Sequence, residues 1–144
     1  MTLCILLAVD GSEGSLHAVR RLLRLRERLG GLELHLLTVL APAESGHVRW
    51  FVDHAQLEDY YRDKGLAALQ QARALLDAAG QGYTPHIAVG LAAATIAHYA
   101  GQVAADLVLM GSHGHGGIGR ALLGSVTAEV IALSPVPVTV VSHD

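Results

Sequence analysis

The residues of this chain with the clearest chemical potential lie in a glycine-rich segment. Residues 110–114 read Met-Gly-Ser-His-Gly, and nine residues further on the chain reads Gly-Ser-Val-Thr over 124–127. Glycine lets a backbone come close to a bulky anion and turn through positive φ. A helix start adds unpaired N–H groups and the positive end of the helix dipole. With a helix expected from Ser125, this segment is a candidate receptor for phosphate.

Two common phosphate motifs fit this segment poorly. Residues 114–119 have the spacing G-x-G-x-x-G, but that dinucleotide fingerprint needs a following βαβ unit with an acidic residue about 20 positions further on. The next predicted strand, over 136–141, contains no acid. Residues 119–125 imitate a P-loop, yet Ser125 stands where the lysine that reaches the phosphates belongs. We therefore expect neither kind of site.

A third spacing, G-x2-G-x9-G-[ST], is satisfied by Gly111, Gly114, Gly124 and Ser125. With this motif the chain resembles the nucleotide-binding branch of the universal stress protein family. Residues 5–12, Ile-Leu-Leu-Ala-Val-Asp-Gly-Ser, resemble the opening strand and turn of that family. Residues 133–141 resemble its last passage from helix to strand, so the resemblance covers essentially the whole chain.

The composition is that of a single globular domain over residues 1–144. With 51% hydrophobic and 16% charged residues the chain is neither disordered nor fibrous. Its net charge of −3 gives no basic field for nucleic acid or an anionic membrane. The apolar run 3–9 is short and lacks a basic leader, so we expect no signal peptide. No run approaches the ~18 residues of a spanning helix, and we expect a cytoplasmic protein.

Short apolar runs alternate with longer helical stretches along the chain. This pattern predicts parallel strands with right-handed helical crossovers and helices on both faces. Ser12 is the expected cap of the first helix, with Glu13 in its first turn, and Gly30 and Gly31 end that helix. The predicted strands are 3–9, 33–40, 83–89, 106–110 and 136–141. The further predicted helices are 54–79, 92–104 and 125–133, and residues 41–53 are a predicted loop.

Ligands of such a sheet bind beyond the carboxyl ends of the strands, where the strand order reverses. Asp10 follows the first predicted strand, and the glycine segment follows the fourth. The family resemblance implies an α/β fold with an open five-stranded, Rossmann-like parallel sheet of order 3-2-1-4-5. That order makes strands one and four neighbours, so Asp10 and the glycine segment are expected to share one crevice.

The expected phosphate donors are backbone N–H groups, those of Gly114, Ser125, Val126 and Thr127. The hydroxyls of Ser125 and Thr127 are expected to donate as well. The alternative is a turn-rich connection that happens to need glycine. The connection from Gly111 to Gly124 is long for a compact domain, and long loops are often functional. This length favours the binding interpretation.

Asp10 can coordinate a Mg²⁺ that bridges phosphates, or accept a hydrogen bond from a ribose hydroxyl. The alternative is an Asx turn or a helix cap, and the roles are compatible. The resemblance favours binding, and it implies that Ala8 and the backbone of Val39 line an adenine slot. Met110 can pack on the base or close the core, and only the resemblance favours contact with the base.

Other titratable residues carry weaker signals. His113 and His115 form an H-x-H pair, but no third metal ligand is evident nearby and a structural zinc site needs four. For this pair we favour donation to phosphate over metal binding, and solvent exposure over both. The other seven histidines show no ligand spacing, and the one cysteine, Cys4, is expected to be a small buried thiol. Arg120 can reach the γ-phosphate or lie in solvent.

The last predicted strand, Val136 to Val141, lies at a sheet edge in the family order. Such an edge exposes backbone groups that can pair with a second copy. Pro135 and Pro137 lack an N–H and blunt part of it. Residues 138–141 are not blocked, and the resemblance implies dimers through this element, so we expect a two-fold homodimer, either edge to edge or face-packed.

The favoured interpretation is a stress-response regulator that binds ATP with Mg²⁺ and sets the state of a dimer for an unknown downstream protein. A slow ATPase is one alternative. Any hydrolysis should be slow because no lysine, glutamate or glutamine lies between Gly111 and Thr127. A sensor of AMP or cyclic AMP would use the same adenine slot. A dimerising protein without ligand is the last alternative, which the complete glycine motif disfavours.

Overall fold

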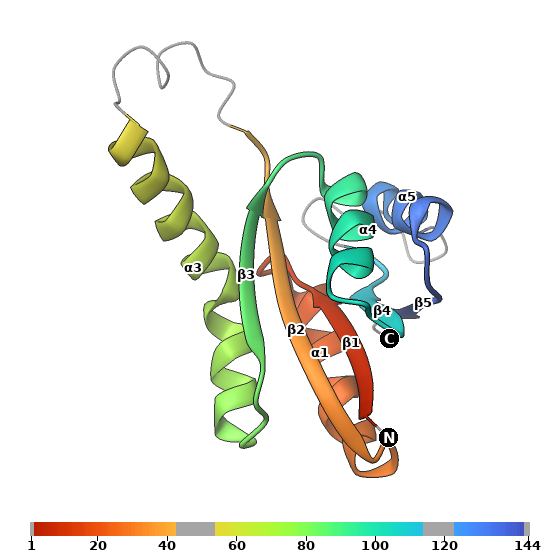
Figure 1. Ribbon diagram of the computed structural model, residues 1–144. Coiled ribbons are helices and arrows are strands. Elements are labelled where there is room, and N and C mark those ends of the chain that lie inside the picture. The colour runs from red at the N-terminus through yellow and green to blue at the C-terminus, as the bar shows by residue number, and fades with distance from the viewer. Residues whose placement is uncertain (1, 43–53, 114–122, 143–144) are drawn as a thin grey trace.

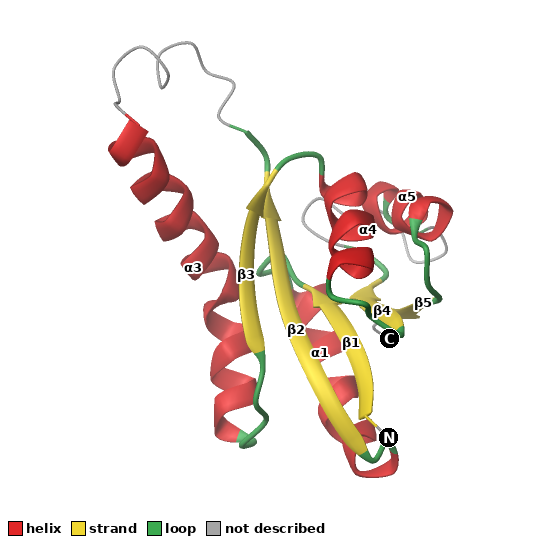
Figure 2. Ribbon diagram, in the orientation of Figure 1, coloured by secondary structure: helices red, strands yellow, loops and turns green. Residues whose placement is uncertain are grey.

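The computed structural model describes residues 2–42, 54–113 and 123–142. Its strands and helices alternate along the chain (Figure 2). The strands are β1 (Thr2–Ala8), β2 (Gly31–Leu40), β3 (Thr84–Val89), β4 (Leu107–Gly111) and β5 (Val138–Val141). The helices of the described residues are α1 (Glu13–Leu25), the 3₁₀ helix η1 (Arg26–Arg28), α3 (His54–Ala78), α4 (Ala92–Gln102) and α5 (Ser125–Leu133).

The five strands form one parallel sheet with the order β3-β2-β1-β4-β5. The central strand β1 pairs with β2, where Ala8 lies opposite Leu37, and with β4, where Leu7 lies opposite Leu109. The predicted α/β class and strand order are confirmed. Strand order reverses between β1 and β4, and this reversal places the candidate site.

Each face of the sheet is covered by its own apolar layer. Ile5, Leu7 and Leu36 belong to the layer that α1 and α3 cover, whereas Leu6 and Val108 belong to the layer that α4 and α5 cover. Figure 1 shows α1 and α3 behind the sheet and α4 in front of it. Because alternate residues of a strand point to opposite faces, a strand covered on both sides must be apolar throughout. The prediction of helices on both faces is confirmed.

A tight turn carries the chain from β1 into α1. Gly11 has a φ of 83°, in the left-handed region that glycine adopts without strain. Ser12 is the N-cap, and its Oγ accepts a hydrogen bond from the N–H of Ser15 at 3.3 Å. Glu13 lies in the first turn, where the helix dipole favours an acid. The predicted start of this helix is confirmed.

Some predicted bounds differ from the observed ones. β5 begins at Val138 and not at Val136, since the intervening Pro137 has no N–H for the ladder. The carbonyl of Pro137 still accepts from the N–H of Val108 at 2.9 Å. α4 ends at Gln102 rather than at 104, and Ala104 then adopts a left-handed φ of 54°. Among the helices described, none is both long and apolar enough to cross a membrane.

Candidate functional site

The carboxyl ends of β1 and β4 lie side by side where the strand order reverses. Asp10 follows β1, and Gly111 is the last residue of β4. Parallel sheets of this kind bind ligands at such a point. The fold therefore brings together the acid and the start of the glycine segment, as the sequence analysis expected.

The three residues expected to line an adenine slot lie on one face of the sheet. Ala8 and Met110 are 7% and 6% exposed, and Val39 packs against the same apolar layer under α4. They come from the carboxyl halves of three adjacent strands, β1, β4 and β2. Met110 thus does close the core, which was one of its two predicted roles. Contact of these residues with a base stays a prediction.

The carboxylate of Asp10 forms an Asx turn, because its Oδ1 accepts a hydrogen bond from the N–H of Ser12 at 2.9 Å. The N–H of Asp10 donates to the Oγ of Ser15 at 3.3 Å. The turn role that the sequence left open is confirmed. These bonds hold the half-buried carboxylate at the edge of the sheet, a position compatible with the predicted metal or ribose role.

Two hydrogen bonds tie the start of α5 to the end of β4. The N–H of Gly124 donates to the carbonyl of Ser112 at 2.8 Å, and the Oγ1 of Thr127 donates to the carbonyl of Gly111 at 3.0 Å. Thr127 is only 3% exposed. Its hydroxyl donates to Gly111 in this structure, and donation from the same hydroxyl to phosphate stays a prediction. Its role is to fix the helix start against the sheet.

The N-terminus of α5 offers backbone donors without a capping side chain. The N-cap is Gly124, and the first bond of the helix runs from the N–H of Ala128 to the carbonyl of Gly124 at 3.0 Å. Within the described ranges, no acceptor pairs with the N–H groups of Ser125, Val126 or Thr127. Such groups, with the helix dipole behind them, attract an anion.

Gly111 is a glycine for a reason that the sequence analysis missed. A Cβ on Gly111 would lie 2.5 Å from the carbonyl oxygen of Gly14, and a Cβ on Gly14 would collide with the carbonyl oxygen of His113. Two backbones therefore touch here, the first turn of α1 and the exit of β4. Gly111 therefore serves packing, and its role at a phosphate stays a prediction. No pattern in the sequence indicates this contact. Gly14 lies within an ordinary helical stretch, and the residues that it touches, Gly111 and His113, lie at the end of β4 and just after it, far away in the sequence.

His113 stands at the last described position before Gly114. Its Nδ1 lies 3.1 Å from the Oγ of Ser112. Its Nε2 is buried and has no hydrogen-bond partner among the described residues. A buried ring nitrogen without a partner is uncommon, and it is consistent with the predicted donation to a ligand. Gly114, His115 and Arg120, the other predicted contacts of this segment, lie outside the described residues.

Comparison with known proteins identifies the family. The sequence model of the universal stress protein family matches residues 1–142. The chain belongs to this family. Universal stress protein Slr1230 of Synechocystis sp. is 31% identical over 93% of this chain. This chain spans 40% of the length of that relative.

Solved structures agree with the family and the fold. The structure of hypothetical protein MJ0577 has a TM-score of 0.82 at 29% identity, with 99% of this chain and 96% of that chain covered. The structure of a universal stress protein in complex with cAMP has a TM-score of 0.70 at 27% identity, with 96% of each chain covered. The Rossmann-like architecture of this universal stress protein is thus shared with both.

Proposed function

We propose that this universal stress protein is a regulator that binds an adenine nucleotide, with ATP preferred, beyond the carboxyl ends of β1 and β4. The observation that carries the proposal is the open N-terminus of α5. Its N–H groups at Ser125, Val126 and Thr127 lie beside the exit of β4 with no capping side chain. The relative that was crystallised with cAMP supports an adenine ligand.

The roles of the surrounding residues follow from this placement. The phosphates lie at the N-terminus of α5, with the N–H of Gly114 and the hydroxyl of Ser125 as further donors. The base lies against Ala8, Val39 and Met110. Asp10 lies across from the phosphates, and its negative charge would repel them unless a cation stands between. A Mg²⁺ ion, which prefers carboxylate and phosphate oxygens, removes that repulsion.

Nucleotide binding acts as a switch in this proposal. The bound ligand favours one state of the protein, and a downstream protein reads a surface of that state. The working unit is a single domain over residues 1–144 that forms a homodimer through β5 and acts in the cytoplasm. Turnover of ATP, if any, is slow. A sensor of cyclic AMP is the second candidate, which the cAMP-bound relative favours.

A proline substitution tests the decisive observation. Ser125 is the first residue of α5, where proline fits a helix, so Ser125→Pro removes one N–H while the helix is kept. We expect ATP affinity, measured by calorimetry, to fall about tenfold or more, as for a lost hydrogen bond to a charged group. Ser125→Ala removes only the hydroxyl, so its loss of ATP affinity should be smaller.

The matched control is Ala92→Pro, at the first position of α4. It removes an equivalent N–H elsewhere and should leave ATP affinity unchanged. Equal affinity in the wild-type protein and Ser125→Pro, with both folded by circular dichroism, would refute the proposed phosphate site.

A further inference from the structure

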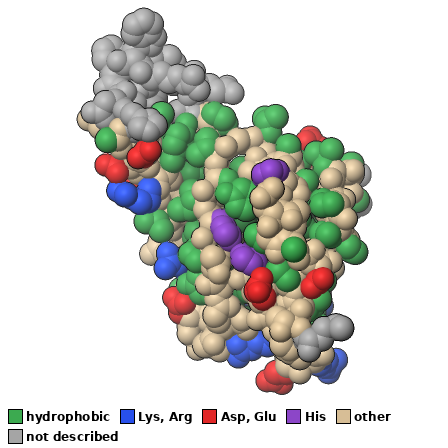
Figure 3. Space-filling model, in the orientation of Figure 1, with side chains coloured by type: hydrophobic (Ala, Val, Ile, Leu, Met, Phe, Trp, Pro, Cys, Tyr) green, Lys and Arg blue, Asp and Glu red, His purple; other side chains and the backbone are tan. Residues whose placement is uncertain are grey.

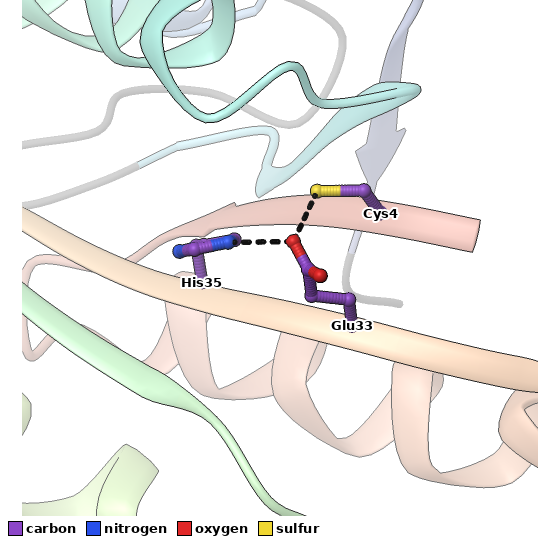
Figure 4. A group of neighbouring side chains, drawn as sticks. All are labelled: Cys4, Glu33 and His35. Atoms are coloured by element: carbon purple, nitrogen blue, oxygen red, sulfur yellow. Dashed lines mark hydrogen bonds and ion pairs between the residues drawn. The ribbon is translucent and has the colours of Figure 1, made fainter. Parts of the chain in front are cut away.

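Three potential metal ligands converge on the sheet face that α4 covers, away from the nucleotide crevice. The Oε2 of Glu33 lies 3.4 Å from the Sγ of Cys4 and 3.0 Å from the Nε2 of His35. The three ligand atoms all lie within 4.8 Å of one another. Figure 4 shows the thiol of Cys4, from β1, and the ring of His35, from β2, both directed toward the carboxylate of Glu33. We call them the Cys4 cluster.

The sheet register creates this cluster. Cys4 on β1 lies opposite Glu33 on β2, and His35, two residues along, points to the same face. The amino half of β2 and the end of α4 meet here, and the Sγ of Cys4 also lies 3.6 Å from the carbonyl of Val103. The expected burial of the Cys4 thiol is confirmed. The sequence analysis assigned His35 no ligand role. Cys4 and His35 lie on different strands, so their positions in the sequence do not show a metal-ligand motif.

The cluster gathers groups that a cation would hold together. Asp106 is a further nearby negative charge, and its Oδ2 accepts from the N–H of Cys4 at 2.8 Å. A bound metal ion would displace the thiol proton and compensate these charges.

We propose that Cys4, Glu33 and His35 bind a thiophilic divalent metal ion, Zn²⁺ in the first place. Sulfur and imidazole ligands select Zn²⁺ over Mg²⁺ or Ca²⁺, which prefer oxygen. Bonds of about 2.3 Å to sulfur and about 2.0 Å to nitrogen and oxygen place tetrahedral ligand atoms roughly 3.3–3.5 Å apart. The two separations to Glu33, 3.4 and 3.0 Å, are close to that requirement.

A second histidine is placed to orient the first. The Nδ1 of His35 lies 2.9 Å from the Nε2 of His86 on β3. With a metal ion on its Nε2, His35 keeps a hydrogen on Nδ1 and donates it to His86, as metal-binding histidines usually do to an outer partner. The rings also stack, with centroids 5.1 Å apart.

The site has a route to solvent and a place for a further ligand. The side chain of Glu33 is 58% exposed and that of His35 is 15% exposed. Figure 3 shows histidine and acidic side chains meeting at the surface of this face. Three protein ligands leave one tetrahedral position for water or another small ligand. The alternative is a hydrogen-bonded chain from thiol to carboxylate to imidazole without a metal ion.

Cobalt titration separates the two possibilities. Nucleotide-free, reduced protein is stripped with a chelator and titrated with Co²⁺ alone, and Zn²⁺ affinity is then measured by competition. We expect one Co²⁺ per chain, with the intense d–d bands of a tetrahedral site and a charge-transfer band from thiolate. Cys4→Ser should abolish that band, and both Cys4→Ser and His35→Asn should weaken Zn²⁺ binding at least tenfold. His86→Asn should lower Zn²⁺ affinity by about 10- to 100-fold, as is usual when the outer hydrogen-bond partner of a metal ligand is removed.

The control is His98→Asn, which removes an exposed histidine outside the cluster and should change nothing. Circular dichroism checks that each variant is folded. A cobalt spectrum without the thiolate band in wild-type protein, or one that Cys4→Ser leaves intact, would overturn the metal site in favour of the hydrogen-bonded chain. Neither result depends on nucleotide binding, so failure here and failure of the proposed function are distinguishable.

Discussion

Asp10 shows how one side chain can serve both a turn and a ligand. Its Oδ1 accepts from the N–H of Ser12, which shapes the passage from β1 into α1. An Asn side chain can make the same bond, because its amide oxygen is also an acceptor, but it carries no charge. The two roles can therefore be separated by mutation.

Asp10→Asn should retain the melting temperature of the wild-type protein and lose the Mg²⁺-dependent part of ATP affinity. Asp10→Ala should lose the Mg²⁺-dependent part of ATP affinity and also stability. We expect its free energy of unfolding to fall by about 0.5–2 kcal/mol, as for a lost helix cap. Calorimetry with and without Mg²⁺, together with urea unfolding, measures both effects. If Asp10→Asn binds ATP and Mg²⁺ as the wild-type protein does, Asp10 serves the turn alone.

Gly14 is the second residue whose smallness is required by a neighbouring backbone. A Cβ there collides with the carbonyl of His113, whereas a Cβ on Gly101, in α4, meets nothing within 4 Å. Gly14→Ala should lower the free energy of unfolding by about 1–3 kcal/mol, the usual cost of overpacking. Gly101→Ala should leave it unchanged or raise it by up to about 1 kcal/mol, because alanine favours a helix. Equal stabilities of the two variants in urea would contradict the close contact.

Among the elements, β5 forms one edge of the sheet, and β3 forms the other. In the described part of the sheet β5 pairs with β4 alone. The carbonyls of Pro137 and Val141 accept hydrogen bonds from the N–H groups of Val108, in β4, and of Ser112, directly after it. Since backbone groups alternate along a strand, those of Val138 and Val140 point to the open edge. This edge is where the proposed dimer forms.

Val140→Pro should convert a dimer into a monomer in sedimentation experiments, because it removes the edge N–H that a second copy would use. Val140→Ala is the matched control. It removes side-chain volume but keeps the N–H, and it should remain dimeric. A wild-type protein that sediments as a monomer, or a dimeric Val140→Pro, would exclude pairing through this edge.

The elements could be predicted from local sequence, but contacts between elements could not. Apolar runs and the Asp10-Gly11 turn indicated β1 and the start of α1, because burial on both faces leaves a direct pattern. The strand order came from the family resemblance, since periodicity does not say which strands are neighbours. Gly14 and the Cys4 cluster were missed for the same reason. Their roles depend on register and on backbone approach between elements distant in sequence.

At the scale of the whole molecule, a ligand that binds only the folded state stabilises the entire domain. At a hundred times its dissociation constant the gain is about 2.7 kcal/mol, which raises the melting temperature of a domain of this size by several degrees. Matched thermal shifts with ATP, AMP and cyclic AMP therefore rank the candidate nucleotides. We expect the largest shift with ATP and Mg²⁺, and Gly114→Val should abolish it. A larger shift with cyclic AMP would favour the second candidate function.

The contact between Gly14 and Gly111 also limits how a nucleotide signal can leave the crevice. Because the two backbones touch, α1 cannot move closer to the exit of β4. Helix α5 has a different attachment, through the bonds of Gly124 and Thr127 to β4. Movement caused by a filled phosphate site is therefore expected in α5 and β5, toward the edge proposed for dimer formation, more than in α1.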